Sequence, residues 1–235
     1  RSPGGETTTL GRSGSDTTAA LLGAALGAKE VVIWTDVDGV LTADPRVVPE
    51  ARLLTRLSYR EAAEMTYFGA KVLHFPAVLP AIAARIPLVI RNSFAPEGPG
   101  TTISEKGDPR PGIRAVTAVS GLCLLSLNGK GMSGIPGIAA RVFGTTARLG
   151  VSVVMFSQAS SEQNIAIVFP EADRLRTAAA LGQEFRYEKL VGAIDGVAAK
   201  SPIAVVAAVG DGMRGTVGIA AKVFAALAGA GVNVR

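Results

Sequence analysis

The chain has 235 residues, of which 48% are apolar, 18% charged and 5% aromatic. This length and composition indicate a globular protein of one or two domains. The formal charge is +5, but Lys and Arg are scattered singly and aromatic residues are few. Nucleic acid is therefore not an expected partner. A membrane is not expected either, because no run of about 18 apolar residues is present.

The amino-terminal region predicts a helix followed by a buried strand. A Gly/Ser turn, LGRSGSD, leads into an Ala/Leu run, with Ser15 or Asp16 as the predicted N-cap and Gly27 as the predicted stop. The apolar run Val31–Trp34 then predicts a buried strand. The strand leads directly into an acidic turn, which is the first candidate for chemistry.

This acidic turn, WTDVDGVLTADPR, is compatible with two kinds of enzyme. Its DVDGVLT portion resembles the first motif of haloacid-dehalogenase-like phosphatases, with Asp36 as nucleophile and Asp38 as acid. Such enzymes also need later acids to hold Mg²⁺, and the chain contains no Asp-Asp pair. Asp211 is a late acid, but it belongs to a repeat whose other copy has Lys130 there. The phosphatase is therefore a distant alternative.

Further elements lead up to a polar loop. Residues 58–73 have apolar positions at helical spacing and predict a helix, whereas Pro76 and Pro80 are expected to break the next segment. A short strand is predicted at Pro87–Ile90. The stretch 92–108 is rich in Pro, Gly, Thr and Ser and is predicted to be a loop that ends the first domain.

The remaining sequence contains an internal repeat. Met132–Val154 and Met213–Arg235 align without gaps at an offset of 81 residues, and 12 of their 23 positions are identical. Each copy has the pattern strand, Gly-rich loop, amphipathic helix, Gly stop and strand, as in a ferredoxin-like module. The first copy continues with a predicted strand in 157–169 and a predicted helix in 171–185.

Four motifs in order resemble those of aspartate kinases. TTTLGRSGSDTTAALL resembles the family's substrate-binding loop and WTDVDGVLTADPR its nucleotide segment. YFGAKVLH resembles a third signature, and RNSFAPEGPGT resembles the end of the kinase domain. The repeat, with IPGIAARVF and SQASSE, resembles the family's tandem ACT regulatory domains.

The resemblance implies an α/β fold: the carboxyl-terminal part of an amino-acid-kinase αβα sandwich, then tandem ferredoxin-like (βαββαβ) ACT domains. Residues 1–108 would belong to the catalytic domain and 113–235 to the ACT region. The first ACT module would span 122–190, inserted into a truncated second module made of 113–119 and 201–235.

The resemblance also implies transfer of a phosphoryl group from ATP, with Mg²⁺, to the side chain of L-aspartate, the first step toward lysine, threonine and methionine. Phosphoryl transfer depends on positioning and charge neutralisation, which a Gly-rich helix start and an Arg can provide. Asp16 would organise the catalytic centre, and aspartate would be bound by Arg12, Ser13, Gly14 and Ser15. The nucleotide would contact Thr35, Asp36, Leu41, Arg46, Lys71 and Val72. No protein metal ligand is assigned.

Some of these positions have simpler explanations or depart from the family pattern. Asp38 precedes a Gly and suits a turn, and Lys71 is also compatible with an exposed helical lysine. Ser13 stands where the family commonly has Gly or Asn, Leu41 where a nucleotide-stacking Tyr is usual, and Phe75 begins an altered segment. Leu41 is therefore expected to weaken nucleotide contact.

Allosteric regulation by an amino acid is the other implication. ACT modules bind amino acids at loop-to-helix starts, where free N–H groups meet a carboxylate. Gln158 resembles the glutamine that contacts the effector in threonine-sensitive members, although a strand-end residue explains it equally well. We therefore expect threonine rather than lysine as effector, and a homo-oligomer formed through the ACT domains. The other expected effector contacts are Gly134, Gly137, Ile138 and Ala139.

The spacing of the motifs favours the bifunctional aspartokinase/homoserine dehydrogenase group, whose dehydrogenase would follow Arg235. The family's KFGGTS-like motif, with its phosphoryl-neutralising lysine, is not in this sequence, so the chain alone is expected to be inactive. An alternative function is a regulatory module that only binds an amino acid and self-associates. The single Cys123 lies in an apolar run and indicates a reducing compartment, the cytoplasm.

Overall fold

The computed structural model describes residues 3–70 and 72–234. The chain forms two compact units. One combines Arg1–Ala118 with Val206–Arg235, and the other consists of Val119–Val205. The second unit is therefore an insertion between the two segments of the first.

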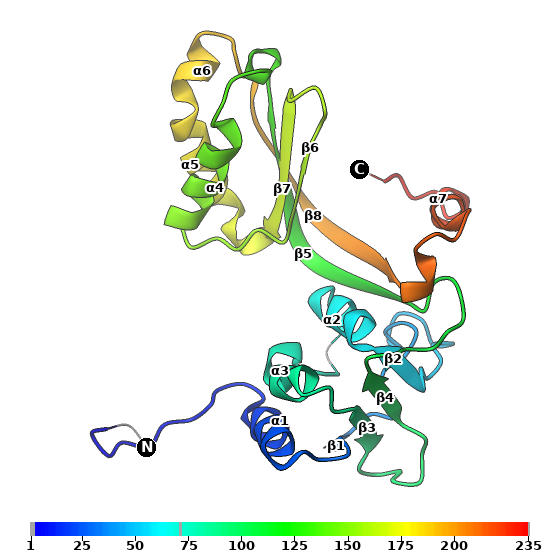
Figure 1. Ribbon diagram of the computed structural model, residues 1–235. Helices are drawn as coiled ribbons and strands as arrows, with labels where there is room; N and C mark the ends of the chain where they lie inside the picture. The colour runs from blue at the N-terminus through cyan, green and yellow to red at the C-terminus, as the bar shows by residue number, and fades with distance from the viewer. Residues whose placement is uncertain (1–2, 71, 235) are drawn as a thin grey trace. The chain divides into compact units, whose positions relative to one another are not determined.

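The first unit contains a mixed four-stranded sheet in the order β1-β3-β4-β2 (Figure 1). β1 (Val31–Thr35) pairs in parallel with β3 (Leu88–Asn92), and β3 pairs antiparallel with β4 (Thr101–Ser104). β4 in turn pairs in parallel with β2 (Arg56–Ser58). The two strands predicted from the sequence, β1 and β3, are therefore confirmed and lie side by side.

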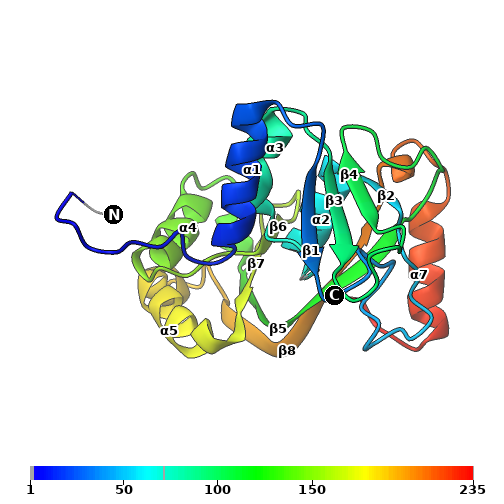
Figure 2. The same cartoon turned by 90° about the horizontal axis from the view of Figure 1, so that it is seen from below.

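Three helices lie along one face of this sheet (Figures 1 and 2): α1 (Gly14–Leu26), α2 (Tyr59–Tyr67) and α3 (Phe75–Ala83). Helix α2 begins with a capping box, in which the side chains of Ser58 and Glu61 each bond the other's backbone N–H. Helix α1 ends at the predicted stop, where a left-handed glycine accommodates the turn toward β1.

Three sequence predictions in this unit were wrong in detail. Helix α2 ends at Tyr67, six residues early, and Gly69 at φ 105° has left the helical region. The prolines do not break α3: Pro76 lies in its first turn, where its missing N–H is not needed, and Pro80 lies inside the helix. The predicted loop 92–108 contains β4, because pairing with two strands overrides its turn-rich composition.

The core of the first unit lies between this sheet and its helices. The end of β8 and the start of β5 also contribute, through Val209 and Ala115, although both strands continue into the second unit. The fully buried aliphatic residues of this core are Ala20, Leu57, Val78, Ala81, Leu88, Ile90 and Ile103.

The second unit is built on a sheet in the order β6-β7-β5-β8. β5 (Ala115–Asn128) and β6 (Met155–Gln158) both pair antiparallel with β7 (Asn164–Pro170), and β8 (Gly196–Val209) lies on the far side of β5. The strand predicted within 157–169 corresponds to β7.

One face of this second sheet is covered by three helices: α4 (Ile138–Arg148), α5 (Arg174–Glu184) and α6 (Arg186–Leu190) (Figure 1). The short 3₁₀ turn η2 (Glu171–Asp173) precedes α5, so the helix predicted from 171 to 185 is confirmed. The hydrophobic core between sheet and helices includes Leu125, Leu127, Val142, Ile167, Phe169, Leu181 and Phe185.

The 81-residue repeat is reproduced in the backbone over a longer stretch than the sequence identity. β5 and β8 begin and end 81 residues apart, and so do α4 and α7 (Ile219–Gly229). The same holds for the 3₁₀ turns η1 (Lys130–Met132) and η3 (Asp211–Met213). The structural repeat therefore starts at Ala115, well before the identical residues.

The two copies hold each other's strand ends through matching hydrogen bonds. The Arg114 N–H donates to the Val209 carbonyl at 2.8 Å, and the Asp195 N–H donates to the Asn128 carbonyl at 2.8 Å. These are the same bond with the copies exchanged, because 195 and 209 lie 81 residues after 114 and 128. Each long strand therefore begins beside the end of the other.

The α/β fold class predicted from the sequence is confirmed by the two mixed α/β units. The predicted domain boundaries stay a prediction. Across the part of the chain that the structure describes, no helix is long and apolar enough to cross a membrane.

Candidate active site

The predicted substrate loop enters α1 through a strained residue. Ser13 is the N-cap, with left-handed φ 57° and ψ 33°, and its side chain caps no N–H group. The N-cap predicted at Ser15 or Asp16 was wrong, because Gly14 already begins the helix. Left-handed backbone costs most residues about 1–2 kcal/mol but suits Gly and Asn. This explains why Gly or Asn would be preferred at position 13.

The first turn of α1 is open toward solvent. Arg12 and Ser15 are exposed, and Asp16 is half-buried and accepts a long hydrogen bond of 3.4 Å from the Ser15 hydroxyl. The Thr17 hydroxyl instead donates back to the Ser13 carbonyl at 3.1 Å. With no side-chain cap, the N–H groups of this turn stay available to an anion.

The start of α1 and the end of β1 lie at the same end of the unit. Gly23 packs so closely on Val31 that a Cβ there would meet a Val31 methyl at 2.5 Å. From Gly23 back to Gly14 the helix rises about 13 Å, and from Val31 to Thr35 the strand rises about 13 Å. Because helix and strand run in opposite directions, the substrate loop and the acidic turn are level with each other.

The acidic turn is tied to the neighbouring strand end. Thr35 is in register with Asn92, and its carbonyl accepts the Ser93 N–H at 2.8 Å. The Asn92 amide donates to Asp38 at 2.7 Å, which gives Asp38 a structural partner. Asp36 is exposed and accepts the Thr35 hydroxyl at 3.1 Å, so its carboxylate keeps most of its hydrogen-bonding capacity at this edge.

Beyond this edge the chain makes a loop whose two arms pair at its neck. The Leu54 N–H donates to the Val40 carbonyl, and the Thr42 N–H to the Arg52 carbonyl, both at 2.8 Å. Leu41, predicted to contact the nucleotide, is bridged to the far arm and is half-buried. Its backbone is therefore part of the neck.

Arg46 stands on the exposed part of this loop beside a carboxylate. Its guanidinium makes two bonds to Asp44, at 3.0 and 2.7 Å, and its N–H bonds the same side chain at 2.9 Å. Asp44 raises the pKa of Arg46. The head of Arg46 remains exposed and in reach of a soluble anion, which would compete with Asp44 for it.

The third predicted nucleotide segment lies only partly within the described residues. Lys71 falls outside them. Val72 is half-buried against the core of the first unit and, with Val40, Met65 and Ile103, lines a small apolar pocket. The structure therefore brings Val72 close to Val40, at the start of the loop that carries Arg46.

The predicted effector residues gather partly at the start of α4. Gly134 and Gly137 have positive φ values, 73° and 92°, as the loop requires, while Ile138 is buried. The Gly134 N–H is already occupied by the Glu162 carboxylate at 2.8 Å. Gln158 is exposed on edge strand β6, and Ala139 is half-buried against the second core.

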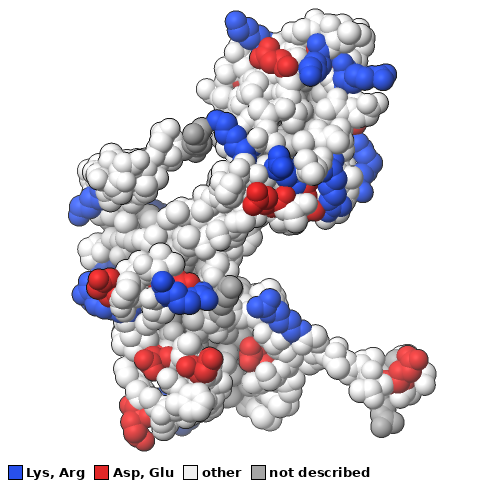
Figure 3. Space-filling model, turned by 180° about the vertical axis from the view of Figure 1, so that it is seen from behind, with Lys and Arg blue, Asp and Glu red and all other residues white. Residues whose placement is uncertain are grey.

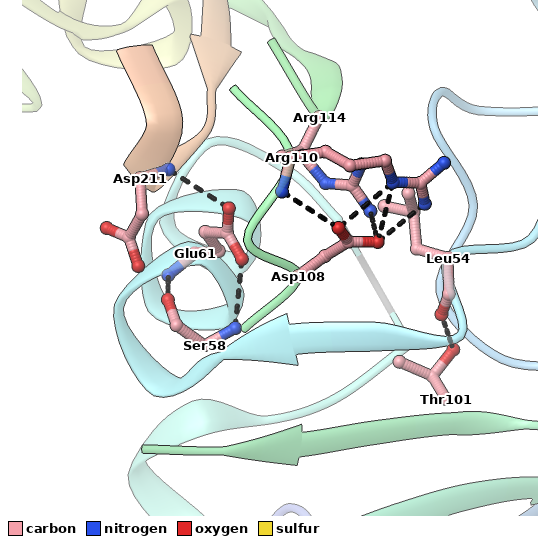
Figure 4. Close-up of polar contacts among 8 residues, drawn as sticks. All are labelled: Leu54, Ser58, Glu61, Thr101, Asp108, Arg110, Arg114 and Asp211. Atoms are coloured by element: carbon pink, nitrogen blue, oxygen red, sulfur yellow. Dashed lines mark hydrogen bonds and ion pairs between the residues drawn. The ribbon is translucent and has the colours of Figure 1, made fainter. Parts of the chain in front are cut away.

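Two polar clusters, one buried and one partly exposed, were not predicted from the sequence (Figure 4). Glu61 is 2% exposed and accepts N–H groups from Ser58 at 2.9 Å and from Asp211 at 3.0 Å. Asp108 lies between Arg110 and Arg114, which hold its pKa well below the usual range. The Ser-x-x-Glu capping pattern signals Glu61, whereas its bond to residue 211 has no local signal.

Figure 3 shows Lys and Arg side chains interspersed with Asp and Glu over the face that it presents. Within the described residues, no group of three or more His, Cys, Asp or Glu side chains is arranged to hold a metal ion. In the acidic turn, Asp36 is exposed, whereas Asp38 is bonded to Asn92 and Asp44 to Arg46.

Models of two known protein families match this chain, one over its amino-terminal region and one over its carboxyl-terminal region. The amino acid kinase family model matches residues 2–92, and an ACT domain model matches 125–185 and 206–235. A bifunctional aspartokinase/homoserine dehydrogenase of Zea mays is 44% identical over 233 residues, 97% of this chain and 25% of the relative. The chain matches the amino acid kinase and ACT domain families, and it is similar to aspartokinases over almost its whole length. This confirms the aspartokinase interpretation over the phosphatase alternative.

Solved aspartokinases share the fold. The Clostridium acetobutylicum aspartate kinase superposes with a TM-score of 0.86 at 29% identity, covering 97% of this chain and 52% of that one. Escherichia coli aspartokinase III in complex with aspartate and ADP gives 0.78 at 36% identity, covering 99% and 51%. Its complex with lysine and aspartate gives 0.66 at 39%, covering 87% and 44%. The chain thus spans about half of these structures.

Proposed function

We propose that the protein to which this chain belongs is an aspartokinase that transfers the γ-phosphoryl group of ATP to the β-carboxylate of L-aspartate. The observation that supports this most strongly is the placement of the open α1 start level with the exposed acidic edge after β1. The start of α1 suits the carboxylate acceptor, and the edge after β1 suits the nucleotide. The related aspartokinase III was solved with aspartate and ADP together.

The acceptor would be held by the substrate loop. Arg12 can form a paired hydrogen bond with a carboxylate, and the open N–H groups at Gly14 and Ser15 favour negative charge at a helix start. The strained conformation of Ser13 turns the loop into the helix at this point. Asp16, half-buried in the first turn, would orient the neighbouring groups of the catalytic centre.

The nucleotide would lie along the acidic edge. Thr35 and Asp36 would contact it at the strand end, and Arg46 would leave Asp44 to neutralise phosphate charge. Val72 would contribute an apolar contact, and Lys71 a further positive charge. Mg²⁺ would arrive on the phosphates. The described carboxylates do not form a cage of their own, as is usual for Mg²⁺ bound with a nucleotide.

Regulation by an amino acid is the second part of the proposal. The Gly134–Ala139 loop would accept the effector carboxylate, which would have to displace Glu162 from the Gly134 N–H. Gln158 would distinguish the effector side chain, with threonine preferred to lysine. We further propose a homo-oligomer through the ACT modules and a fused homoserine dehydrogenase, as in the Zea mays relative.

The predicted boundaries complete the proposal: 1–108 for the kinase part and 113–235 for the ACT region, with 122–190 inserted between 113–119 and 201–235. A cytoplasmic location belongs to it as well. Cys123 is buried as a free thiol, and burial raises its pKa, which keeps the thiol protonated and unreactive.

Calorimetry on the 235-residue chain tests this function directly. We expect ADP with Mg²⁺ to bind, and Arg46→Ala to weaken binding about tenfold by removing phosphate neutralisation. Arg56→Ala, another exposed arginine of the first unit, serves as the control and should bind like the parent. Binding of threonine without any binding of ADP or aspartate would favour the purely regulatory alternative. In the full-length protein, Asp16→Asn should lower kcat strongly.

A further inference from the structure

Thr101 is a fully buried polar residue that joins two distant points of the chain. Its hydroxyl accepts the Val40 N–H at 2.8 Å and donates to the Leu54 carbonyl at 2.7 Å. The two partners are 61 and 47 residues away in sequence. Figure 4 shows the bond between Thr101 and Leu54 at the edge of the sheet.

These two partners are the entry and exit of the loop that carries Arg46. Val40 and Leu54 also bond each other, and the next contacts outward are the Leu41–Leu53 bridge and the Thr42–Arg52 bond. A pair of arms this short has little stability of its own in water. The hydroxyl of Thr101, supplied by β4, therefore fastens the neck of the loop to the sheet.

The surroundings leave little room for another arrangement. A Cβ on Gly39, where φ is 139°, would meet the Thr101 hydroxyl at 2.4 Å and its backbone nitrogen at 3.1 Å. Gly100, with φ 64°, brings its backbone so close to Ile90 that a Cβ there would meet the Ile90 carbonyl at 2.3 Å. Gly39 thus allows the acidic turn to approach β4 closely enough for the Thr101 hydroxyl to reach both partners, and Gly100 allows the start of β4 to approach β3.

We propose that Thr101 is a positioning residue for the nucleotide. It sets the distance between the acidic strand end, with Thr35 and Asp36, and the loop that presents Arg46, so that both can engage one phosphate chain. This inference rests on the proposed function. Thr101 is the last residue of the RNSFAPEGPGT segment. It would contribute to nucleotide binding through the position of the loop, without contacting the nucleotide itself.

Thr101→Val and Thr101→Ser separate positioning from packing. Valine keeps the shape but leaves the buried Val40 N–H and Leu54 carbonyl without their partner. Serine keeps both hydrogen bonds and loses a methyl group. Thr177→Val is the matched control, because Thr177 is also fully buried but lies in the other unit, on α5.

The experiment measures ADP–Mg²⁺ affinity of the 235-residue chain by calorimetry, with amide hydrogen exchange of residues 40–54. We expect Thr101→Val to raise Kd about tenfold and to speed exchange in the loop, while Thr101→Ser and Thr177→Val stay within about twofold of the parent. In the full-length enzyme, Thr101→Val should raise KM for ATP more than it lowers kcat, and KM for aspartate should not change.

Equal ADP affinity in the parent and Thr101→Val would overturn this inference and leave the proposed function standing. An equal loss in Thr101→Ser and Thr101→Val would also overturn it, since packing rather than the hydroxyl would then be responsible. A parent chain that binds no ADP while its amides from 40 to 54 are protected would instead contradict the proposed function, and the inference with it.

Discussion

Helices α4 and α7 have closely related sequences and the same place in the repeat, but their surroundings differ. Both follow a left-handed glycine, Gly137 or Gly218, and both span 11 residues. α4 buries four residues, whereas α7 buries none. β7 and α5 contribute buried residues to the core against which α4 packs. The comparison shows that local sequence sets the helix, while burial depends on what packs against it.

The second copy has an attachment that the first lacks. The Asp211 N–H at the start of η3 donates to buried Glu61, and the Asp211 side chain lies 3.7 Å from Arg60. The equivalent residue of the first copy is Lys130, and no carboxylate bond to its N–H occurs among the described residues. Thus the first copy is stabilised by its own core, and the second by its connection to α2 of the first unit.

The largest difference should come from truncating the equivalent core positions. Val142 is 1% exposed, and Val142→Ala should destabilise the second unit by about 2–3 kcal/mol through lost burial and a residual cavity. Val223→Ala, half-buried on α7, should change stability by less than about 0.5 kcal/mol. Calorimetric unfolding of both variants measures this. Equal losses would mean that α7 is as well covered in solution as α4.

Removing the hydrogen bond from the Asp211 N–H to Glu61, called the anchor below, should affect only the second copy. Proline suits the first position of a helical turn and deletes its N–H, so Asp211→Pro leaves one oxygen of Glu61 without a partner. We expect it to cost about 2 kcal/mol relative to Lys130→Pro, which removes an N–H that bonds no carboxylate. Because both variants gain the same stiffness in the unfolded chain, their difference in urea midpoint measures the Asp211 N–H bond to Glu61 together with the exposed contact between Asp211 and Arg60, which contributes little. Matching midpoints would rule out a stabilising anchor.

A smaller effect is expected from the arginine on α4. Arg141 bonds Glu184 at 2.9 Å, pairs with Glu188 and stacks over Phe185 at 4.4 Å, whereas its counterpart Lys222 is exposed. Arg141→Ala should cost about 1 kcal/mol at neutral pH, and Lys222→Ala almost nothing.

This cost has a defined pH dependence. Arg141 lowers the pKa of Glu184 and Glu188 in the folded protein, so their contribution is present above about pH 4.3, the unfolded value, and is lost as pH falls through the lowered folded values. The parent and Arg141→Ala should therefore converge in stability in acid. A gap that persists at low pH would point to packing on Phe185 instead.

The smallest difference should be found at the repeated glycines. Gly137 and Gly218 have φ values of 92° and 85°, and in both cases a Cβ would meet nothing within 4 Å. Alanine at either position should cost about 1 kcal/mol of local stability, through backbone strain alone. Hydrogen exchange in the first turns of α4 and α7 measures each cost separately. Unequal costs at the two positions would show that neighbouring residues, and not backbone strain alone, determine the effect of the substitution.

The elements that could be predicted were those with a local signal. The strand Val31–Trp34 was found from its apolar run, and Gly27 from its place after an Ala/Leu helix. β4 was missed because its four residues lie among turn formers and are fixed by pairing with β2 and β3. The N-cap at Ser13 was missed because serine does not favour the left-handed conformation that Ser13 adopts.

In the candidate site as well, some residues could be predicted from local motifs, whereas their long-range contacts could not. The family motifs pointed to Arg12, Asp16, Asp36 and Arg46, and the structure places the first two level with the third. The bond of Asp38 to Asn92 and the occupation of the Gly134 N–H by Glu162 could not be foreseen, since each joins residues far apart in sequence.

The sequence by itself determined the family, the order of the motifs and the 81-residue repeat, because these depend on residue identity and short-range periodicity. Only the tertiary structure decided that Thr101 fastens the loop that carries Arg46, that Glu61 accepts the Asp211 N–H and that α4 contains buried residues while α7 does not. Hydrogen-bond geometry and exclusion of water depend on distant groups meeting in space, and that information is not written in any local stretch of the chain.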